Sequence, residues 1–222
     1  MSVLEVWNRA LSAVNARGRL TSLTDRTPEQ EVCSEWYTLA RDIIQTAAWW
    51  PACKSLARLA EVSEADEEWT EGDPEPGYQF AFALPADFLH PWHLTDYSRF
   101  SLSFSSTLSR VIISTNTENP ILVYARRNEA PAQWTTGHYE ATVHALAYKI
   151  ANPLTGRQSL ADRSFQQAKM ILDEEQARAA NMIEPDPRPA VPWLAARGVQ
   201  SFATSRYFYP FGSLAGLGAN AG

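Results

Sequence analysis

The sequence of 222 residues predicts an α+β fold that is mainly α, a four-helix body formed by two helical pairs that flank an antiparallel β insert, with an extended C-terminal arm. Two observations predict it. Apolar residues recur at three- and four-residue intervals near both ends of the chain, as they do on the buried face of a helix. Between these segments they alternate in short runs, as they do in strands. Because the helical pairs flank the strands, we expect them to meet in space, with the strands projecting as a lobe.

The first two helices are predicted from their caps and their apolar faces. Ser2 and Glu5 have the spacing of a capping box, and an amphipathic pattern follows until Gly18. Thr27 is an N-cap residue followed by a proline at the first helical position, which is typical of a helix start. The second pattern continues until Pro51, which predicts a helix of about twenty residues.

The middle of the chain has strand periodicity. We expect about five or six short strands, from apolar runs at 54–62, 78–83, 92–97, 100–104, 108–114 and 121–126. Residues 61–75 contain eight acids and no Lys or Arg, and such a run is most often a solvated loop.

Helical periodicity then returns for a second pair. The third predicted helix begins near Thr135 or Thr136 and ends at Pro153. The fourth begins near Ser159 and continues to about Ile183. The chain therefore divides into an N-terminal helical pair (1–53), a β-rich insert with its acidic loop (54–130), a C-terminal helical pair (131–184) and an extended docking arm (185–222).

The arm is broken by prolines and glycines but is rich in aromatic rings. It contains five of the ten glycines, and no acid follows Asp186. Six large rings left in water would form an exposed apolar patch, so we expect this segment to become ordered on a partner. The candidate contact residues are Trp193, Arg197, Phe202, Arg206, Tyr207, Phe208, Tyr209 and Phe211.

Charge and apolar patterning exclude several classes of protein. The net charge is −6, and the chain outside residues 61–75 is close to neutral, with 17 acids and 19 bases, which does not indicate a DNA-binding protein. No apolar stretch of about twenty residues and no secretory signal pattern is found, so we expect a cytoplasmic protein without a membrane span. Cys33 and Cys53 lie near opposite ends of the predicted second helix, too far apart for a disulfide.

No pattern indicates a catalytic, cofactor or metal site. His138 and His144 are six residues apart, which places them on different faces of a helix and does not match a zinc signature. His90 and His93 lie at a predicted turn without other ligands at fixed spacing. We therefore expect a protein that is not an enzyme, with no cofactor and no metal.

Three segments carry a resemblance to a known family. They are Trp49-Trp50-Pro51 at the end of the second helix, a strand that leads into 84–89, and 123–134, which includes Arg126-Arg127, before the second helical pair. In this order, over residues 1–183, the chain resembles the head-to-tail adaptor family of short-tailed bacteriophages, also called tail tubular protein A. The resemblance implies a structural virion protein without catalytic residues.

The resemblance also implies partners. Family members form a homo-oligomeric ring, usually of twelve copies, between the portal protein and the tail nozzle and fibres. DNA passes through the ring channel without specific binding, and no membrane is involved. The protein would lie in the neck of the virion after assembly in the host bacterial cytoplasm, with its arm along the portal. Charged residues of the second helical pair either form salt bridges between subunits or are simply exposed; they are Glu140, Lys149, Arg163, Lys169, Asp173, Glu174 and Arg178.

Two other functions stay open at this point. One is a virion-associated peptidoglycan hydrolase that uses an acid such as Glu140 together with a distant carboxylate. The other is an adaptor unrelated to phages that recruits a partner through its C-terminal tail.

Overall fold

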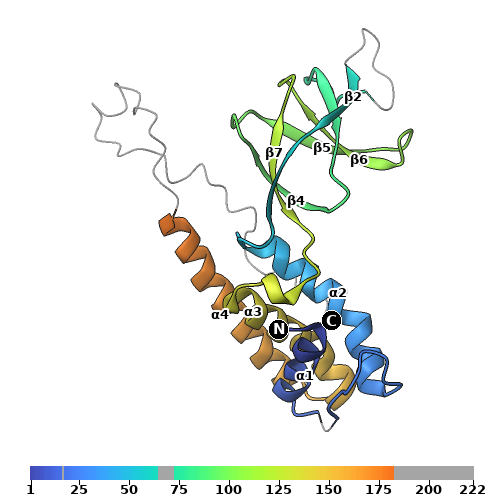
Figure 1. The fold of residues 1–222 in the computed structure, drawn as a ribbon, viewed down its shortest axis with the longest axis vertical. Coiled ribbons are helices and arrows are strands. Elements are labelled where there is room, and N and C mark those ends of the chain that lie inside the picture. Colours follow the sequence, from blue (N-terminus) through green and yellow to red (C-terminus); the bar gives the residue numbers. More distant parts are fainter. Residues whose placement is uncertain (17, 65–72, 183–222) are drawn as a thin grey trace.

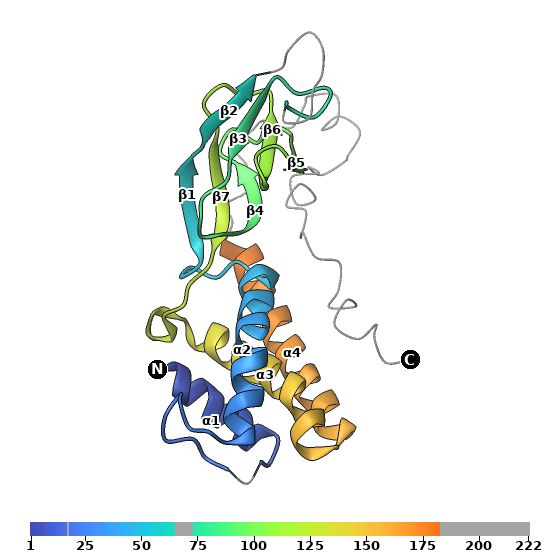
Figure 2. The same cartoon turned by 90° about the vertical axis from the view of Figure 1, so that its right-hand side faces the viewer.

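The computed structural model describes residues 1–16, 18–64 and 73–182. These residues form four helices and seven antiparallel strands in two sheets, with 45% of them in helices and 22% in strands. The fold is therefore mixed α+β, and the prediction of a mainly α fold is wrong. The reason is that the insert, within its predicted bounds, folds into seven strands where five or six were expected, and these form two sheets around a hydrophobic core of their own. Figures 1 and 2 show the helices at one end of the molecule and the strands at the other.

The four helices share one core. The helix α3 packs against each of the other three, and the segments before and after the strands therefore lie side by side (Figure 1). The helices are α1 (Val3–Ala13), α2 (Pro28–Ala47), α3 (Thr136–Thr155) and α4 (Gln158–Met182).

Local sequence signals determine where the first two helices begin. The Ser2 side chain and Glu5 form the predicted capping box, and the Thr27 hydroxyl accepts a hydrogen bond from the backbone N–H of Gln30. The end of α1 differs from the prediction. It stops at Ala13 and not near Gly18, because Asn15 takes the left-handed conformation (φ 55°) that ends a helix.

The end of α3 also differs from the prediction. Pro153 lies inside the last turn, and the helix continues to Thr155. A proline there removes a single backbone hydrogen bond, which its neighbours in the last turn can tolerate. Gly156, with a φ of 64°, ends the helix instead, and its N–H donates to the carbonyl of Asn152.

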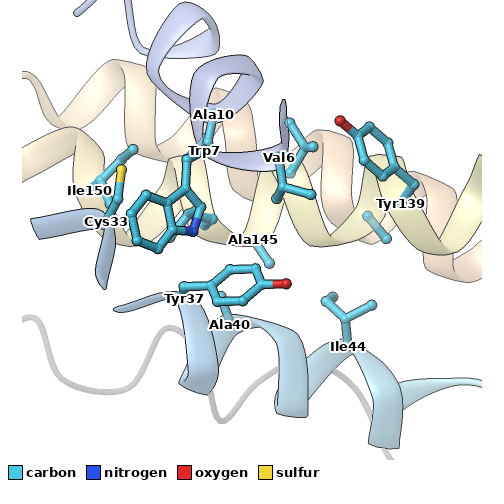
Figure 3. Packing of buried hydrophobic residues seen from close by; sticks show 14 of the residues in the cluster. Val6, Trp7, Ala10, Cys33, Tyr37, Ala40, Ile44, Tyr139, Ala145 and Ile150 are labelled. Atoms are coloured by element: carbon cyan, nitrogen blue, oxygen red, sulfur yellow. The ribbon is translucent and has the colours of Figure 1, made fainter. Parts of the chain in front are cut away.

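Large side chains of α1, α2 and α3 fill the core of the helical body. The rings of Trp7 and Tyr37 meet edge to face, with 6.0 Å between their centroids (Figure 3). Leu146 and Ile150 of α3 belong to the same cluster and are completely buried. The amphipathic pattern read from the sequence is thus the pattern of this core.

The strands form two antiparallel sheets, in the orders β1-β7-β4 and β2-β3-β6-β5. The single run predicted at 54–62 is two strands, separated at Leu59, which enters the core of the lobe. The predicted strand 92–97 begins earlier, and two register shifts accommodate Pro91 within it. The strands are β1 (Lys54–Arg58), β2 (Ala60–Glu64), β3 (Phe80–Ala83), β4 (Phe88–Leu94), β5 (Phe100–Ser105), β6 (Arg110–Thr115) and β7 (Ile121–Arg126).

Candidate functional site

A buried polar network joins the helical body to the β lobe. The Gln45 amide of α2 donates to the carbonyl of Asn128 (2.6 Å) and accepts from its N–H (3.0 Å). The Asn128 amide donates to the carbonyl of Ala52 and the side chain of Gln133, and its oxygen accepts from the N–H of Ala130. Buried amides that are satisfied in this way hold their surroundings in one arrangement. The network is therefore a structural joint between α2 and the chain that leaves β7.

An ion cluster lies next to the joint, because it includes Arg127 and Glu129, the neighbours of Asn128 in the sequence. The Arg41 guanidinium is almost fully buried and contacts the carboxylates of Asp42 (2.8 Å) and Glu129 (3.4 Å). Arg127, which follows β7, reaches the second oxygen of Asp42 at 3.2 Å. The two arginines and two carboxylates compensate each other within the chain, so the cluster supports the joint.

A stack of aromatic rings forms a further contact between the segment after α2 and the β lobe. Trp49, which follows α2, stacks on Trp92 and His93 of β4, with 4.3 and 5.7 Å between centroids. Tyr97 stacks on His93 at 4.9 Å, and the Lys54 ammonium lies 6.0 Å from the Trp49 ring. Burial, with a smaller contribution from Lys54, lowers the pKa of His93. The stack links the helical body to the β lobe through ring contacts. Its rings are half-buried, except for the exposed ring of Tyr97.

The side chain of His138 is packed in the core of the helical body. Its ring lies between those of Trp50 and Trp134, with 4.8 and 4.4 Å between centroids, and it is completely buried. Burial lowers the pKa of His138 to about 3, so the ring is neutral near pH 7. Within residues 1–16, 18–64 and 73–182 neither ring nitrogen has a hydrogen-bond partner, and no group of three His, Cys, Asp or Glu side chains is placed to hold a metal ion.

The two predicted inter-subunit residues on α3 contact other side chains of the same chain. The carboxylate of Glu140 accepts a hydrogen bond from the Arg9 guanidinium of α1. The Lys149 ammonium lies 5.7 Å from the ring of Trp36 and 5.3 Å from that of Tyr148. These contacts stabilise the helical body, so Glu140 and Lys149 do not need a second subunit to be satisfied.

The other five predicted residues lie together on the exposed face of α4, which we call the α4 face. Arg178 pairs with Glu174 and with the neighbouring Glu175. Arg163, Lys169 and Asp173 form no ion pair with any residue that the structure describes. Part of the face is a shallow, open groove lined by Gln166, Lys169, Met170, Asp173, Glu174 and Ala177. The α4 face is therefore our candidate site: the sequence predicts its residues as contacts between subunits, and in the structure they are exposed on one helix.

The structure also has an exposed apolar surface that the sequence analysis does not predict. The exposed fractions are 39% for Leu102 and 65% for Phe104 of β5, 36% for Leu108 in the turn that follows, and 42% for Val111 of β6. We call these four residues the β5 edge surface. A signal for it is present in the sequence, because residues 100–109 contain no charge and no proline although they lie at the surface.

Several predicted features lie outside the described residues, among them the whole docking arm with Trp193, Arg197, Phe202, Arg206, Tyr207, Phe208, Tyr209 and Phe211. Cys33 and Cys53 are buried free thiols, and burial raises the pKa of each to about 12. None of the helices in the described part of the chain has the length and apolarity needed to cross a membrane.

Comparison of the chain with protein-family models found no match, and comparison with curated proteins found none either.

Proposed function

We propose that the protein is a structural head-to-tail adaptor of a short-tailed bacteriophage. Copies form a ring, as the resemblance of residues 1–183 to the adaptor family implies. The ring joins the portal protein to the tail nozzle and fibres, and packaged DNA passes through its channel without specific binding. In this proposal the arm of residues 185–222 docks on the portal.

The α4 face is the observation that carries the proposal. In a closed ring each subunit offers two different surfaces to its two neighbours. Charges of both signs that are unpaired within one chain, such as Lys169 and Asp173, can then pair across the boundary between subunits. The helix has 25 residues and is therefore about 37 Å long, which is enough for an extended interface.

The charge balance of the chain supports a conduit. Each phosphate neutralised by Lys or Arg adds to DNA affinity through the release of counterions, and a basic channel wall would therefore retard ejection. With 17 acids and 19 bases outside residues 61–75, this part of the chain is close to neutral and lacks the large excess of basic residues that would make such a wall.

Charge reversal on the α4 face tests ring formation. Arg163→Glu combined with Lys169→Glu should abolish rings in electron micrographs of the protein, alone or with portal. Arg19→Glu combined with Arg157→Glu is the matched control, since it makes the same charge change at two exposed positions off α4. We expect rings from the wild type and the control. Rings from the α4 variant, with circular dichroism showing all three folded, would contradict the role of this face.

Removal of the arm tests portal docking. A chain truncated after Ile183 should keep its helices and strands, because the residues of the two hydrophobic cores lie before residue 183. It should no longer cosediment with portal, whereas the full chain should. Attachment retained by the truncated chain would contradict the docking role of the arm.

A further inference from the structure

The β5 edge surface is an uncovered continuation of the core of the β lobe. Leu102 pairs with Ile113 of β6, which is completely buried in that core, and Phe104 pairs with Val111 one step further along. Directly paired residues of antiparallel strands point to the same face of the sheet, and so do alternate residues of one strand. The face that buries Ile113 therefore continues to Phe104, which is 65% exposed.

The backbone of β5 is also available for pairing. β5 is the last strand of its sheet, and among the described residues no strand pairs with its outer side. Proteins protect such edges with charges, prolines or bulges, yet β5 has an uninterrupted register with β6 and the neutral sequence FSLSFS. One edge strand of the other sheet, β1, carries Lys54 and Arg58. An apolar, neutral edge of this kind is a template for one more strand.

The arm contains a segment that fits this template. Residues 199–209 read VQSFATSRYFY, with no proline and no acid, and they lie between Gly198 and Pro210. Aromatic residues, Val and Thr favour strands, and flanking Gly and Pro are typical strand boundaries. Arg206 is the only charge in the segment. Its composition therefore matches the neutral, aromatic character of β5.

The connection is long enough to reach β5. Both views in Figures 1 and 2 place the last turns of α4 beside the base of the β lobe. Sixteen residues separate Met182 from Val199 and can span about 55 Å when extended. The strands of the lobe have four to seven residues and are about 13–23 Å long, so the tether exceeds the length of any of them. A tethered segment also has a high effective concentration at its own lobe.

We propose that, in the free protein, residues 199–209 add to β5 as a further antiparallel or parallel strand of the same chain and cover Leu102 and Phe104. The strand satisfies the open backbone groups of β5, and its aromatic rings complete the apolar face. The same covering keeps the arm and the edge from pairing with other chains before assembly. It goes beyond the adaptor function, since it concerns the protein without any partner.

Hydrogen exchange measured by mass spectrometry on the full chain tests this pairing. In the wild type we expect residues 199–209 to exchange at least about tenfold more slowly than residues 185–197. Phe104→Ser and Tyr207→Pro should each abolish this protection, the first by removing the apolar contact and the second by interrupting the strand. Leu56→Ser is the control for Phe104→Ser, because Leu56 is 59% exposed on the edge strand of the other sheet. Ala195→Pro is the control for Tyr207→Pro, and both controls should keep the protection.

Three results would overturn the proposal. They are exchange of residues 199–209 as fast as that of residues 185–197, equal effects of Phe104→Ser and Leu56→Ser, and protection that increases with protein concentration over about a tenfold range, which would indicate pairing between chains. Ring formation is measured separately, so failure of the adaptor function leaves this test unchanged.

Discussion

The helical body and the β lobe bury their apolar residues to different extents. The core of the body contains 24 buried residues from all four helices and the segments around them, whereas the core of the lobe contains six. Of the ten large apolar side chains that are exposed within the described residues, six belong to the lobe. The body is thus complete in itself, and the lobe has apolar surface that only another segment or molecule can cover.

This difference suggests a division of roles. In the adaptor proposed above, a self-contained body would provide a rigid base, and the charged α4 face would form contacts between subunits. The lobe is stabilised by fewer core residues and by the polar joint at Asn128. We therefore expect the lobe to respond more strongly to a single change than the body does.

The largest expected effect comes from Phe82→Ala in the core of the lobe. Phe82 is 1% exposed, and truncation of a buried phenylalanine costs about 3–5 kcal/mol of unfolding free energy. Because the core has only six members, we expect the strands to lose hydrogen-exchange protection while the helices keep theirs. Leu146→Ala in the body is the comparison, with an expected cost of about 2–5 kcal/mol and loss of protection in the helices. If helices and strands lost protection together in both variants, the helical body and the β lobe would unfold as one unit.

Asn128→Ala should weaken the joint between the two regions. It removes the side-chain hydrogen bonds to Ala52, Gln133 and Ala130 and leaves buried groups unpaired, at a cost of about 2–3 kcal/mol in denaturant unfolding. The control is Asn116→Ala, whose hydrogen bond from the N–H of Gln79 is exposed. If Asn116→Ala lowered the free energy of unfolding as much as Asn128→Ala, the joint would contribute no more to stability than an exposed hydrogen bond.

His138 should make the stability of the body depend on pH. Its pKa is about 3 in the folded protein, below the ordinary value of 6.5, so the unfolded chain binds a proton first as the pH falls. Stability is therefore complete above pH 6.5 and is lost between 6.5 and 3, by about 1.4 kcal/mol per pH unit. His138→Phe keeps a flat ring between Trp50 and Trp134 and should flatten this dependence in melts at several pH values. An unchanged slope would assign the dependence to other groups.

The smallest effect is expected from Glu140→Gln. Its partner Arg9 is half-exposed, and such surface pairs contribute about 0.2–1 kcal/mol. The variant should unfold within this range of the wild type and should still form rings on the portal. A peptidoglycan-clearing activity in the wild type that is lost in Glu140→Gln would instead favour the hydrolase.

Elements set by local chemistry were predictable. The starts of α1 and α2 follow from the hydroxyls of Ser2 and Thr27, because a cap is a contact between residues three apart. The candidate α4 face was partly predictable for the same reason: charges at helical spacing lie on one face. The sequence pattern did not reveal that Glu140 and Arg9, 131 residues apart, form a pair that removes Glu140 from the candidate surface.

The sequence by itself determined the helical and strand periodicity of the apolar residues and the N-caps of the first two helices. It also determined the neutral run at 100–109 and the aromatic composition of the arm. Only the tertiary structure decided that the run 54–62 divides between two sheets, that Phe104 stays exposed while Ile113 is buried, and that Asn128 meets Gln45. The physical reason is how far apart along the chain the interacting residues lie. A cap or a helical face depends on neighbours within one turn, whereas burial and strand order depend on segments brought together from distant parts of the chain.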